Sequence, residues 1–267
     1  MVSSTADVPA AGDIPGAPGE EILAVRGMHG AAQRAIASAA AFAALGLVAR
    51  HAPEGRLAHL DRAAMRALGT HRRPAGMIAV ARWVSALAEP RFVSALLAAD
   101  VLLAARRIGW RAACAPCVTV ATGAGARHLL STAIARPRPP AAGWLTEPEG
   151  FSLPSKHTTM AVLTAGACLR NADTKNSSSQ LALLLAAAGI GASRVYLGVH
   201  WPADILAAWL FGEGWLSLAE IPQTRAAAPS RQGATRPRGT RRRSSWGCPT
   251  VLPSAARQSC SGGRLSC

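Results

Sequence analysis

Apolar residues gather along this chain in runs of roughly 15–20 residues, close to the ~20 residues with which a helix crosses the hydrocarbon core of a bilayer. Short polar or proline-containing segments separate these runs. The pattern therefore predicts an all-α integral membrane helical bundle with about six transmembrane helices. The predicted spans are residues 35–49, 91–105, 112–134, 157–170, 181–193 and 202–219.

The segment between the first two spans has a different pattern. Apolar residues recur there at helical spacing and polar residues lie between them, the apolar set being Leu57, Leu60, Ala64, Met65 and Leu68 and the polar set Asp61, Arg62 and Arg66. This predicts an amphipathic helix on the membrane surface. A further apolar stretch over residues 76–88 ends at Glu89-Pro90, because proline interrupts a helix. Asp100, inside the second span, is expected to pair locally with Arg106 or Arg107.

Both ends of the chain lack helical periodicity. Residues 1–30 are rich in Ala, Pro, Gly and acids and predict a disordered cytoplasmic leader, whereas residues 222–267 predict a disordered basic tail. Residues 31–221 remain as the transmembrane domain. The net charge of +15 comes largely from the tail and favours a membrane bilayer with anionic lipid as partner. Nucleic acid is not expected, since the tail has a single aromatic residue, Trp246.

The distribution of basic loops predicts an orientation. With the N-terminus inside, the loops at 106–111 and 170–175 and the basic tail all fall in the cytoplasm, as the positive-inside rule prefers, although the basic segment 50–75 then falls outside. This predicts a multi-pass membrane protein with its N-terminus in the cytoplasm. Three polar clusters from different helices then meet at the outer face, namely Arg136–Pro139, Ser155–His157 and Arg194–Asp204.

The last of these clusters carries recognisable chemistry. His200 and Asp204 lie one helical turn apart if a helix resumes near Pro202, so the carboxylate can accept the Nδ1–H of the imidazole and leave Nε2 basic. Arg194 nearby suits a phosphate. Taken alone, the pair also fits a satisfied surface contact in a membrane loop. The other two clusters add an acid, His157, and a second arginine, Arg138, which favours a phosphoryl-transfer site.

Together the three clusters resemble the type 2 phosphatidic acid phosphatase (PAP2) superfamily, whose motifs are Lys-x6-Arg-Pro, Pro-Ser-Gly-His and Ser-Arg-x5-His-x3-Asp. The third motif is complete, as Ser193, Arg194, His200 and Asp204. The second is present as Pro154, Ser155, Lys156 and His157, with lysine where glycine is usual. The first keeps Arg138-Pro139, but Ser131 occupies the position of its lysine. The resemblance covers about residues 35–220 and implies a PAP2/haloperoxidase-like core.

The resemblance implies a role for each matching residue. His200 would attack phosphorus and form a phosphohistidine, Asp204 would orient it, and His157 would protonate the leaving oxygen and then activate water. Arg138, Arg194 and Ser155 would bind the phosphoryl oxygens. No cofactor and no metal are expected. For the lysine missing at Ser131, Lys156 is the first candidate substitute and Arg127, one turn deeper on the same helix, the second.

The predicted function is a metal-independent phosphatase acting on a membrane lipid phosphate or diphosphate, such as polyprenyl diphosphate or phosphatidic acid. The predicted location is a bacterial plasma membrane, with the active site on the outer face. Two alternatives stay open, a lipid phosphotransferase on the same site and a non-catalytic lipid-phosphate binder. Arg136 is expected either to share the phosphate or to contact a lipid headgroup. The sequence leaves the lipid tail and the oligomeric state open.

Overall fold

The computed structural model describes residues 18–52, 54–68, 73–171 and 177–227. Within these residues the secondary structure is helical, with eight α-helices and one short 3-10 turn. The elements are α1 (Pro18–His51), α2 (Arg56–Ala67), α3 (Ala75–Ala86), α4 (Pro90–Ile108), α5 (Trp110–Ile134), η2 (Ala141–Gly143), α6 (Lys156–Asn171), α7 (Ser177–Tyr196) and α8 (Pro202–Ala227). The all-α prediction is confirmed.

Each of the six predicted spans lies within one long helix, in order α1, α4, α5, α6, α7 and α8. By length and hydropathy, two stretches of the described chain qualify as membrane spans, Val25–His51 and Ser178–Tyr196. The span assignment of the other four helices stays a prediction. The boundaries of the bundle differ from those predicted, because α1 already begins at Pro18 and α8 continues to Ala227. The remainder of the predicted leader and tail lies outside the described residues.

Prolines begin or follow the helices whose ends matter for the site. Pro90 stands in the first turn of α4, where its missing N–H has no carbonyl partner to lose, so the predicted break at this point is confirmed. The helix α5 ends at Ala135 in a left-handed conformation, and the proline-rich segment after it stays non-helical. Pro202 begins α8 in the same way that Pro90 begins α4.

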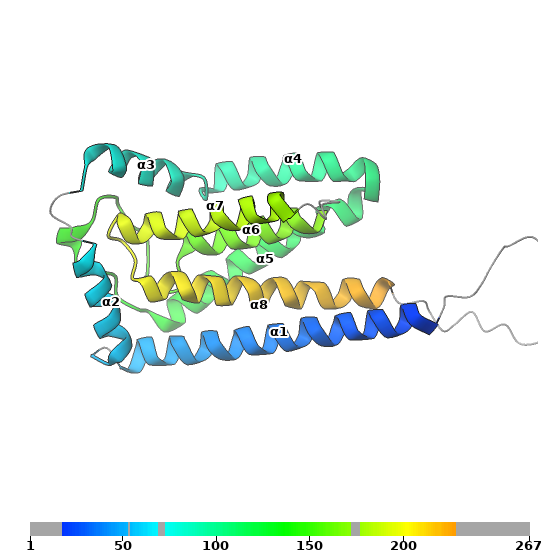
Figure 1. The fold of residues 1–267 in the computed structure, drawn as a ribbon, viewed down its shortest axis with the longest axis horizontal. Coiled ribbons are helices and arrows are strands. Elements are labelled where there is room, and N and C mark those ends of the chain that lie inside the picture. Colours follow the sequence, from blue (N-terminus) through cyan, green and yellow to red (C-terminus); the bar gives the residue numbers. More distant parts are fainter. Residues whose placement is uncertain (1–17, 53, 69–72, 172–176, 228–267) are drawn as a thin grey trace, which may run out of the picture. The chain divides into compact units, whose positions relative to one another are not determined.

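Helix α6 is the centre of the packing. It contacts α4, α5, α7 and α8, while α1 lies along α8 (Figure 1). The core between these helices includes Leu163 of α6, which is fully buried, together with Phe211 and Leu216 of α8. Gly166 lets α6 approach α8 closely, because a Cβ there would lie 2.3 Å from Leu216 Cδ1. The helix that opens with the second polar cluster is thus fixed by contacts on several sides.

The antiparallel order of the helices brings the polar clusters to one end of the bundle. The end of α5, the start of α6, the end of α7 and the start of α8 lie there, and α2 lies at the same end (Figure 1). Helix α2 contacts both α1 and α8. The predicted convergence of three clusters is therefore confirmed, and a fourth element that the sequence assigned to the membrane surface joins them.

Asp100 of α4 interacts electrostatically with Arg107, as expected, but its hydrogen bond comes from a residue far away in sequence. Asn171 at the end of α6 donates its Nδ2–H to Asp100 Oδ2 over 2.6 Å. Arg107 donates to the backbone carbonyl of the same asparagine over 3.3 Å. The acid is therefore satisfied by a side chain that is distant in sequence, and it ties α4 to α6 at the end of the bundle opposite the polar clusters.

Candidate active site

A buried histidine and a buried aspartate form the centre of the site. His200 lies in the short loop between α7 and α8, Asp204 lies in the first turn of α8, and their relative exposures are 1% and 0%. The Nδ1 atom of His200 lies 3.3 Å from Asp204 Oδ2. Upstream in the loop, Gly198 has φ of +78°, and a Cβ there would lie 2.1 Å from the carbonyl oxygen of Gly143. Only glycine fits this turn, which sets the direction of the loop toward His200.

The two neighbours of the His200 ring determine its tautomer. Nη1 of Arg138 lies 3.1 Å from Nε2, and a guanidinium can only donate, so Nε2 must carry the lone pair and Nδ1 the proton. Burial lowers the pKa of His200 to about 4, although the adjacent Asp204 raises it. The imidazole is therefore neutral at pH 7, with its proton on the side of the aspartate. Nε2 is available as a nucleophile once the arginine moves to another acceptor.

Asp204 accepts several hydrogen bonds besides that of His200. The backbone N–H of Trp201 donates to Oδ2 over 2.8 Å, and the hydroxyl of Ser152 donates to the same oxygen. Nη1 of Arg136 donates to Oδ1 over 2.6 Å. These donors hold the carboxylate ionised and in one orientation. The carboxylate in turn holds the imidazole.

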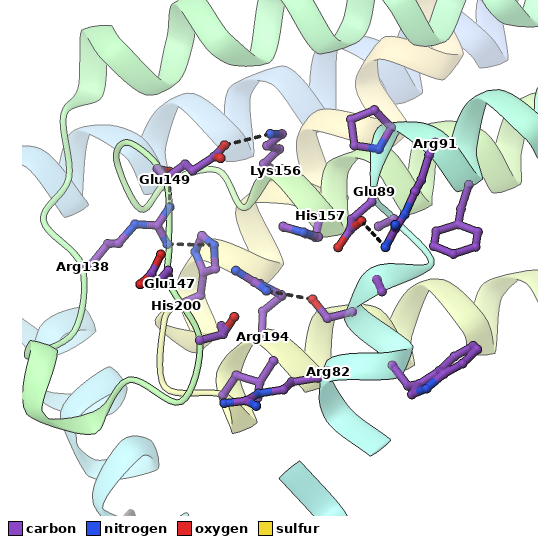
Figure 2. A pocket seen from close by; sticks show the side chains of 18 residues that line it. Arg82, Glu89, Arg91, Arg138, Glu147, Glu149, Lys156, His157, Arg194 and His200 are labelled. Atoms are coloured by element: carbon purple, nitrogen blue, oxygen red, sulfur yellow. Dashed lines mark hydrogen bonds and ion pairs between the residues drawn. The ribbon is translucent and has the colours of Figure 1, made fainter. Parts of the chain in front are cut away.

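Next to His200 is a cavity of about 690 Å³, a size typical of sites for small ligands. Its polar wall contains Arg138, His157, Arg194 and His200, whose side chains surround one space (Figure 2). The opposite wall comes from the end of α3 and the start of α4. It includes Trp83 and Phe92, so the cavity combines a cationic end with aromatic side chains.

Arg194 lines the cavity although it is 5% exposed. Its Nη1 donates to the hydroxyl of Ser85 on α3 over 2.7 Å, as Figure 2 shows. Its Nε–H is buried without a hydrogen-bond partner among the described residues. An unsatisfied guanidinium donor at a cavity wall suits an anionic ligand. Ser85 was not recognised in the sequence, where it is one small polar residue inside an apolar stretch.

Arg138 holds the loop before α6 as well as the nucleophile. Its Nε and Nη2 donate to the carbonyls of Gly150, Glu149 and Phe151, and its Nη1 donates to Val199 over 2.8 Å. Burial lowers its pKa from the usual value, yet an arginine remains charged at neutral pH. A phosphate at Nε2 would meet this guanidinium directly.

Of the second polar cluster, Lys156 and His157 line the cavity and Ser155 does not. His157 and Lys156 open α6 and both line the cavity. Nζ of Lys156 lies 3.2 Å from Glu149 Oε2, in a pair whose members are 42% and 85% exposed. Ser155 is fully buried, accepts a hydrogen bond from the hydroxyl of Thr158 over 3.1 Å, and is not one of the residues that line the cavity. Its observed contacts stabilise the start of α6.

Two arginines differ from what the sequence predicted. Arg127, the second candidate for the missing lysine, donates through Nε and Nη2 to the carbonyl of Pro154 over 2.9 and 2.6 Å and does not line the cavity. It supports the backbone of the second cluster from beneath, and Ser131 is likewise buried. Arg136 does not line the cavity next to His200. It is buried between Asp204 and Asp61 of α2, an acid that was predicted to lie on a solvated face.

The residues that the structure describes contain no group of three or more His, Cys, Asp or Glu side chains arranged to hold a metal ion. The positive charge at the cavity comes from five side chains that line it, Arg82, Arg91, Arg138, Lys156 and Arg194, and three glutamates, Glu89, Glu147 and Glu149, line it as well. Two of these arginines, Arg138 and Arg194, lie close to the two histidines (Figure 2). Such an arrangement can bind an anion, present a nucleophilic nitrogen to it and supply a proton from the opposite side.

Comparison with known proteins agrees with this geometry. Residues 112–224 match the model of the PAP2 superfamily. Among curated proteins, an undecaprenyl-diphosphatase of Sulfolobus acidocaldarius is 32% identical over 75 residues, which span 28% of this chain and 34% of that protein's length. Among solved structures, the crystal structure of a transmembrane PAP2 type phosphatidylglycerolphosphate phosphatase from Bacillus subtilis matches with a TM-score of 0.63 and 21% identity. That match covers 72% of this chain and 96% of the other.

Proposed function

The chain belongs, through residues 112–224, to the PAP2 superfamily, and from this premise we propose that it is a phosphatase that hydrolyses a phosphate monoester or diphosphate of a membrane lipid. One observation carries the proposal. His200, whose Nδ1 is next to Asp204, lines a cavity that His157, Arg138 and Arg194 also line, although these residues come from three separate segments. A binding protein would have no use for both a nucleophile and a second histidine at the phosphate.

In the first step His200 Nε2 attacks phosphorus. The bond between phosphorus and the leaving oxygen breaks, and His157 gives that oxygen a proton, since an alkoxide alone leaves poorly. The ring of His200 acquires positive charge as the N–P bond forms, and the carboxylate of Asp204 stabilises it through the Nδ1–H. The product of this step is a phosphohistidine and the lipid alcohol, or the lipid monophosphate when the substrate is a diphosphate.

In the second step water replaces the lipid product. His157, now without its proton, takes one from water, whose oxygen attacks phosphorus as the N–P bond breaks. Inorganic phosphate leaves and His200 returns to its starting tautomer. The reaction needs no metal on this scheme, because the guanidinium groups of Arg138 and Arg194 face the charge that moves onto the equatorial oxygens.

Lys156 is the first choice to supply the charge that Ser131 lacks. It lines the cavity, and its partner Glu149 is 85% exposed, so the ion pair is weak enough to yield to a phosphate. Arg127 is left out of the proposed phosphate site because it does not line the cavity and its Nε and Nη2 donate to the carbonyl of Pro154. Ser155 assists through the position of the first α6 N–H groups, which favour an anion at the helix start.

The aromatic wall of the cavity supports a lipid as substrate. Trp83 is 72% exposed and Phe92 38% exposed, and both lie at the α3–α4 junction where an acyl or prenyl chain could leave the cavity toward the bilayer. The names of the relatives fit this class, since one is an undecaprenyl-diphosphatase and the other a phosphatidylglycerolphosphate phosphatase. We further propose that the site opens on the outer face of a bacterial plasma membrane.

The test uses the purified protein in detergent with EDTA and a panel of lipid phosphates and diphosphates. Phosphate release that persists in EDTA and is lost in His200→Ala is the expected result. Acid-labile phosphate should appear on the wild-type protein when turnover is stopped by rapid quenching in alkali, and it should be absent from His200→Ala, which lacks the nucleophile. Release that survives His200→Ala would overturn the proposal.

Two further outcomes identify the alternatives. Phosphate that is transferred to an added alcohol in preference to water would identify a phosphotransferase, and binding without any release would identify a lipid-phosphate binder. The sidedness is tested with a short-chain lipid phosphate that does not cross the membrane. Intact spheroplasts should hydrolyse it and sealed inverted vesicles should not, and the reverse result would place the site inside.

A further inference from the structure

Two further charged residues, Arg136 and Asp61, form a buried cluster with Asp204. Arg136 donates through Nη1 to Asp204 Oδ1 and through Nη2 to Asp61 Oδ2, each over 2.6 Å. The relative exposures of Asp61, Arg136 and Asp204 are 3%, 6% and 0%. One buried guanidinium therefore bridges two buried carboxylates, one from the start of α8 and one from α2.

Asp61 has a second contact with the same part of the molecule. Its Oδ1 accepts the backbone N–H of Ala203 over 3.0 Å, in the first turn of α8. The residue thus binds both the arginine that holds Asp204 and the helix that carries Asp204. An acid that only completed the polar face of a surface helix would make neither contact.

The charges in this cluster do not balance. With His200 neutral, the buried groups are two carboxylates and one guanidinium, so the cluster carries one net negative charge. Without Asp61, Arg136 would neutralise Asp204 completely and weaken its hold on the Nδ1–H of His200. With Asp61 present, the guanidinium is shared and Asp204 retains more of its charge. That charge is of use when the His200 ring becomes positive during the first step of the proposed reaction.

We propose that Asp61 is a positioning residue for phosphoryl transfer, acting through Arg136 to orient Asp204 and to keep a net negative charge beneath His200. The inference rests on the proposed phosphatase function. It gives α2 a place in the reaction, although no residue of α2 lines the cavity that contains His200. The chain of contacts runs from Asp61 to Arg136, from Arg136 to Asp204 and from Asp204 to His200.

The test substitution is Asp61→Asn, which keeps an oxygen for the N–H of Ala203 and removes the charge. We expect kcat to fall about tenfold, the lower end of the loss in activity that follows when a residue that orients a metal ligand is removed from a metal site. KM should stay within twofold, because Asp61 does not reach the phosphate. The rate of phosphohistidine formation in a single turnover should fall with kcat. Glu54→Gln is the matched control, since Glu54 is an exposed acid just before α2.

Asp61→Glu separates charge from packing. It restores the negative charge on a longer side chain and should recover most of the kcat that Asp61→Asn loses. If Asp61→Asn does not fold, the double variant Asp61→Asn with Arg136→Met takes its place, because it removes the whole ion pair. It should likewise lose at least tenfold in kcat per folded molecule, with KM unchanged.

The outcomes distinguish this inference from the function on which it rests. His200→Ala is measured in the same assay. If that variant is inactive while folded Asp61→Asn, or the double variant, keeps the wild-type kcat, then the phosphatase proposal stands and the role of Asp61 is overturned. An Asp61→Asn protein that is less stable but has an unchanged kcat would show a purely structural residue. Activity that survives His200→Ala would overturn the phosphatase proposal itself.

Discussion

Removing the guanidinium of Arg136 should destabilise the fold severely. Arg136→Met keeps an apolar side chain of similar length but leaves Asp61 and Asp204 as buried carboxylates without their shared cation. Breaking a buried ion pair by deleting one partner typically costs about 3–5 kcal/mol. Asp204 still has the donors Trp201 N–H, Ser152 and His200, whereas Asp61 keeps only the N–H of Ala203 among the hydrogen bonds found for it. Most of the penalty therefore arises at Asp61, and a total of about 3–5 kcal/mol is expected.

The measurement is thermal unfolding of the purified variants in one detergent. A loss of that size lowers the Tm by roughly 6–20 °C in a domain of this size. The control is Arg91→Met, whose ion pair with Glu89 spans 2.9 Å but is 70% and 40% exposed, so its loss should cost about 0–1 kcal/mol. The deciding result is the effect of Asp61→Asn on the Tm, which should have opposite signs in the wild type and in Arg136→Met. Asp61→Asn should lower the Tm of the wild type but raise that of Arg136→Met, because it removes the unpaired charge. Equal Tm losses in Arg136→Met and Arg91→Met would refute the reasoning.

Three further predictions follow from the site. Gly198→Ala should prevent stable folding, because φ is +78° and the new Cβ would lie 2.1 Å from Gly143 O, whereas Gly125→Ala, with nothing within 4 Å, should leave the Tm unchanged or raise it. The pKa of His200 in the folded protein is about 4, below the usual 6.5, so its contribution to stability is present above pH 6.5 and is lost as the pH falls from 6.5 toward 4. The Tm measured over this pH range should therefore fall less steeply in His200→Asn than in the wild type. Of Lys156 and Arg127, only Lys156 lines the cavity, so Lys156→Met should raise KM about tenfold with little change in Tm. Arg127→Met should instead lower the Tm, because Arg127 holds the carbonyl of Pro154. The opposite pattern in steady-state kinetics and thermal unfolding would reverse the two assignments.

The fold was largely predictable because hydrophobic runs and prolines carry strong local signals. The six long helices and the break at Pro90 follow directly from them. The end of the leader did not, since α1 starts at Pro18 in a stretch whose small and acidic residues suit both a helix and a disordered segment. The site was predictable where fixed spacing determines contact, as for His200 and Asp204, which are one turn apart.

Contacts between segments far apart in sequence could not be predicted in this way. Asp61 has the surroundings of a solvated residue in its own helix, with Arg62 beside it, but α2 packs against other helices and Asp61 is buried there against Arg136 and Ala203. Ser85 is equally inconspicuous inside an apolar stretch. A signal for Asp61 did exist, because a carboxylate on a helix close to a basic proline-rich segment has a cationic partner available. The sequence offered several such arginines and no means of choosing among them.

The pair Arg136 and Arg138 shows where spacing alone stops being informative. In a strand, residues two apart face the same side, and both arginines would then reach one phosphate. Proline at 137 and 139 fixes φ near −65° and favours a threefold extended turn, in which residues two apart point in different directions. Arg136 accordingly binds Asp204 Oδ1 over 2.6 Å, and Arg138 approaches His200 Nε2 to 3.1 Å. The histidine–aspartate pair is thus held from both ends by arginines of one segment. A substitution that changes the backbone there, such as Pro137→Gly, should disturb the nucleophile and the phosphate site together.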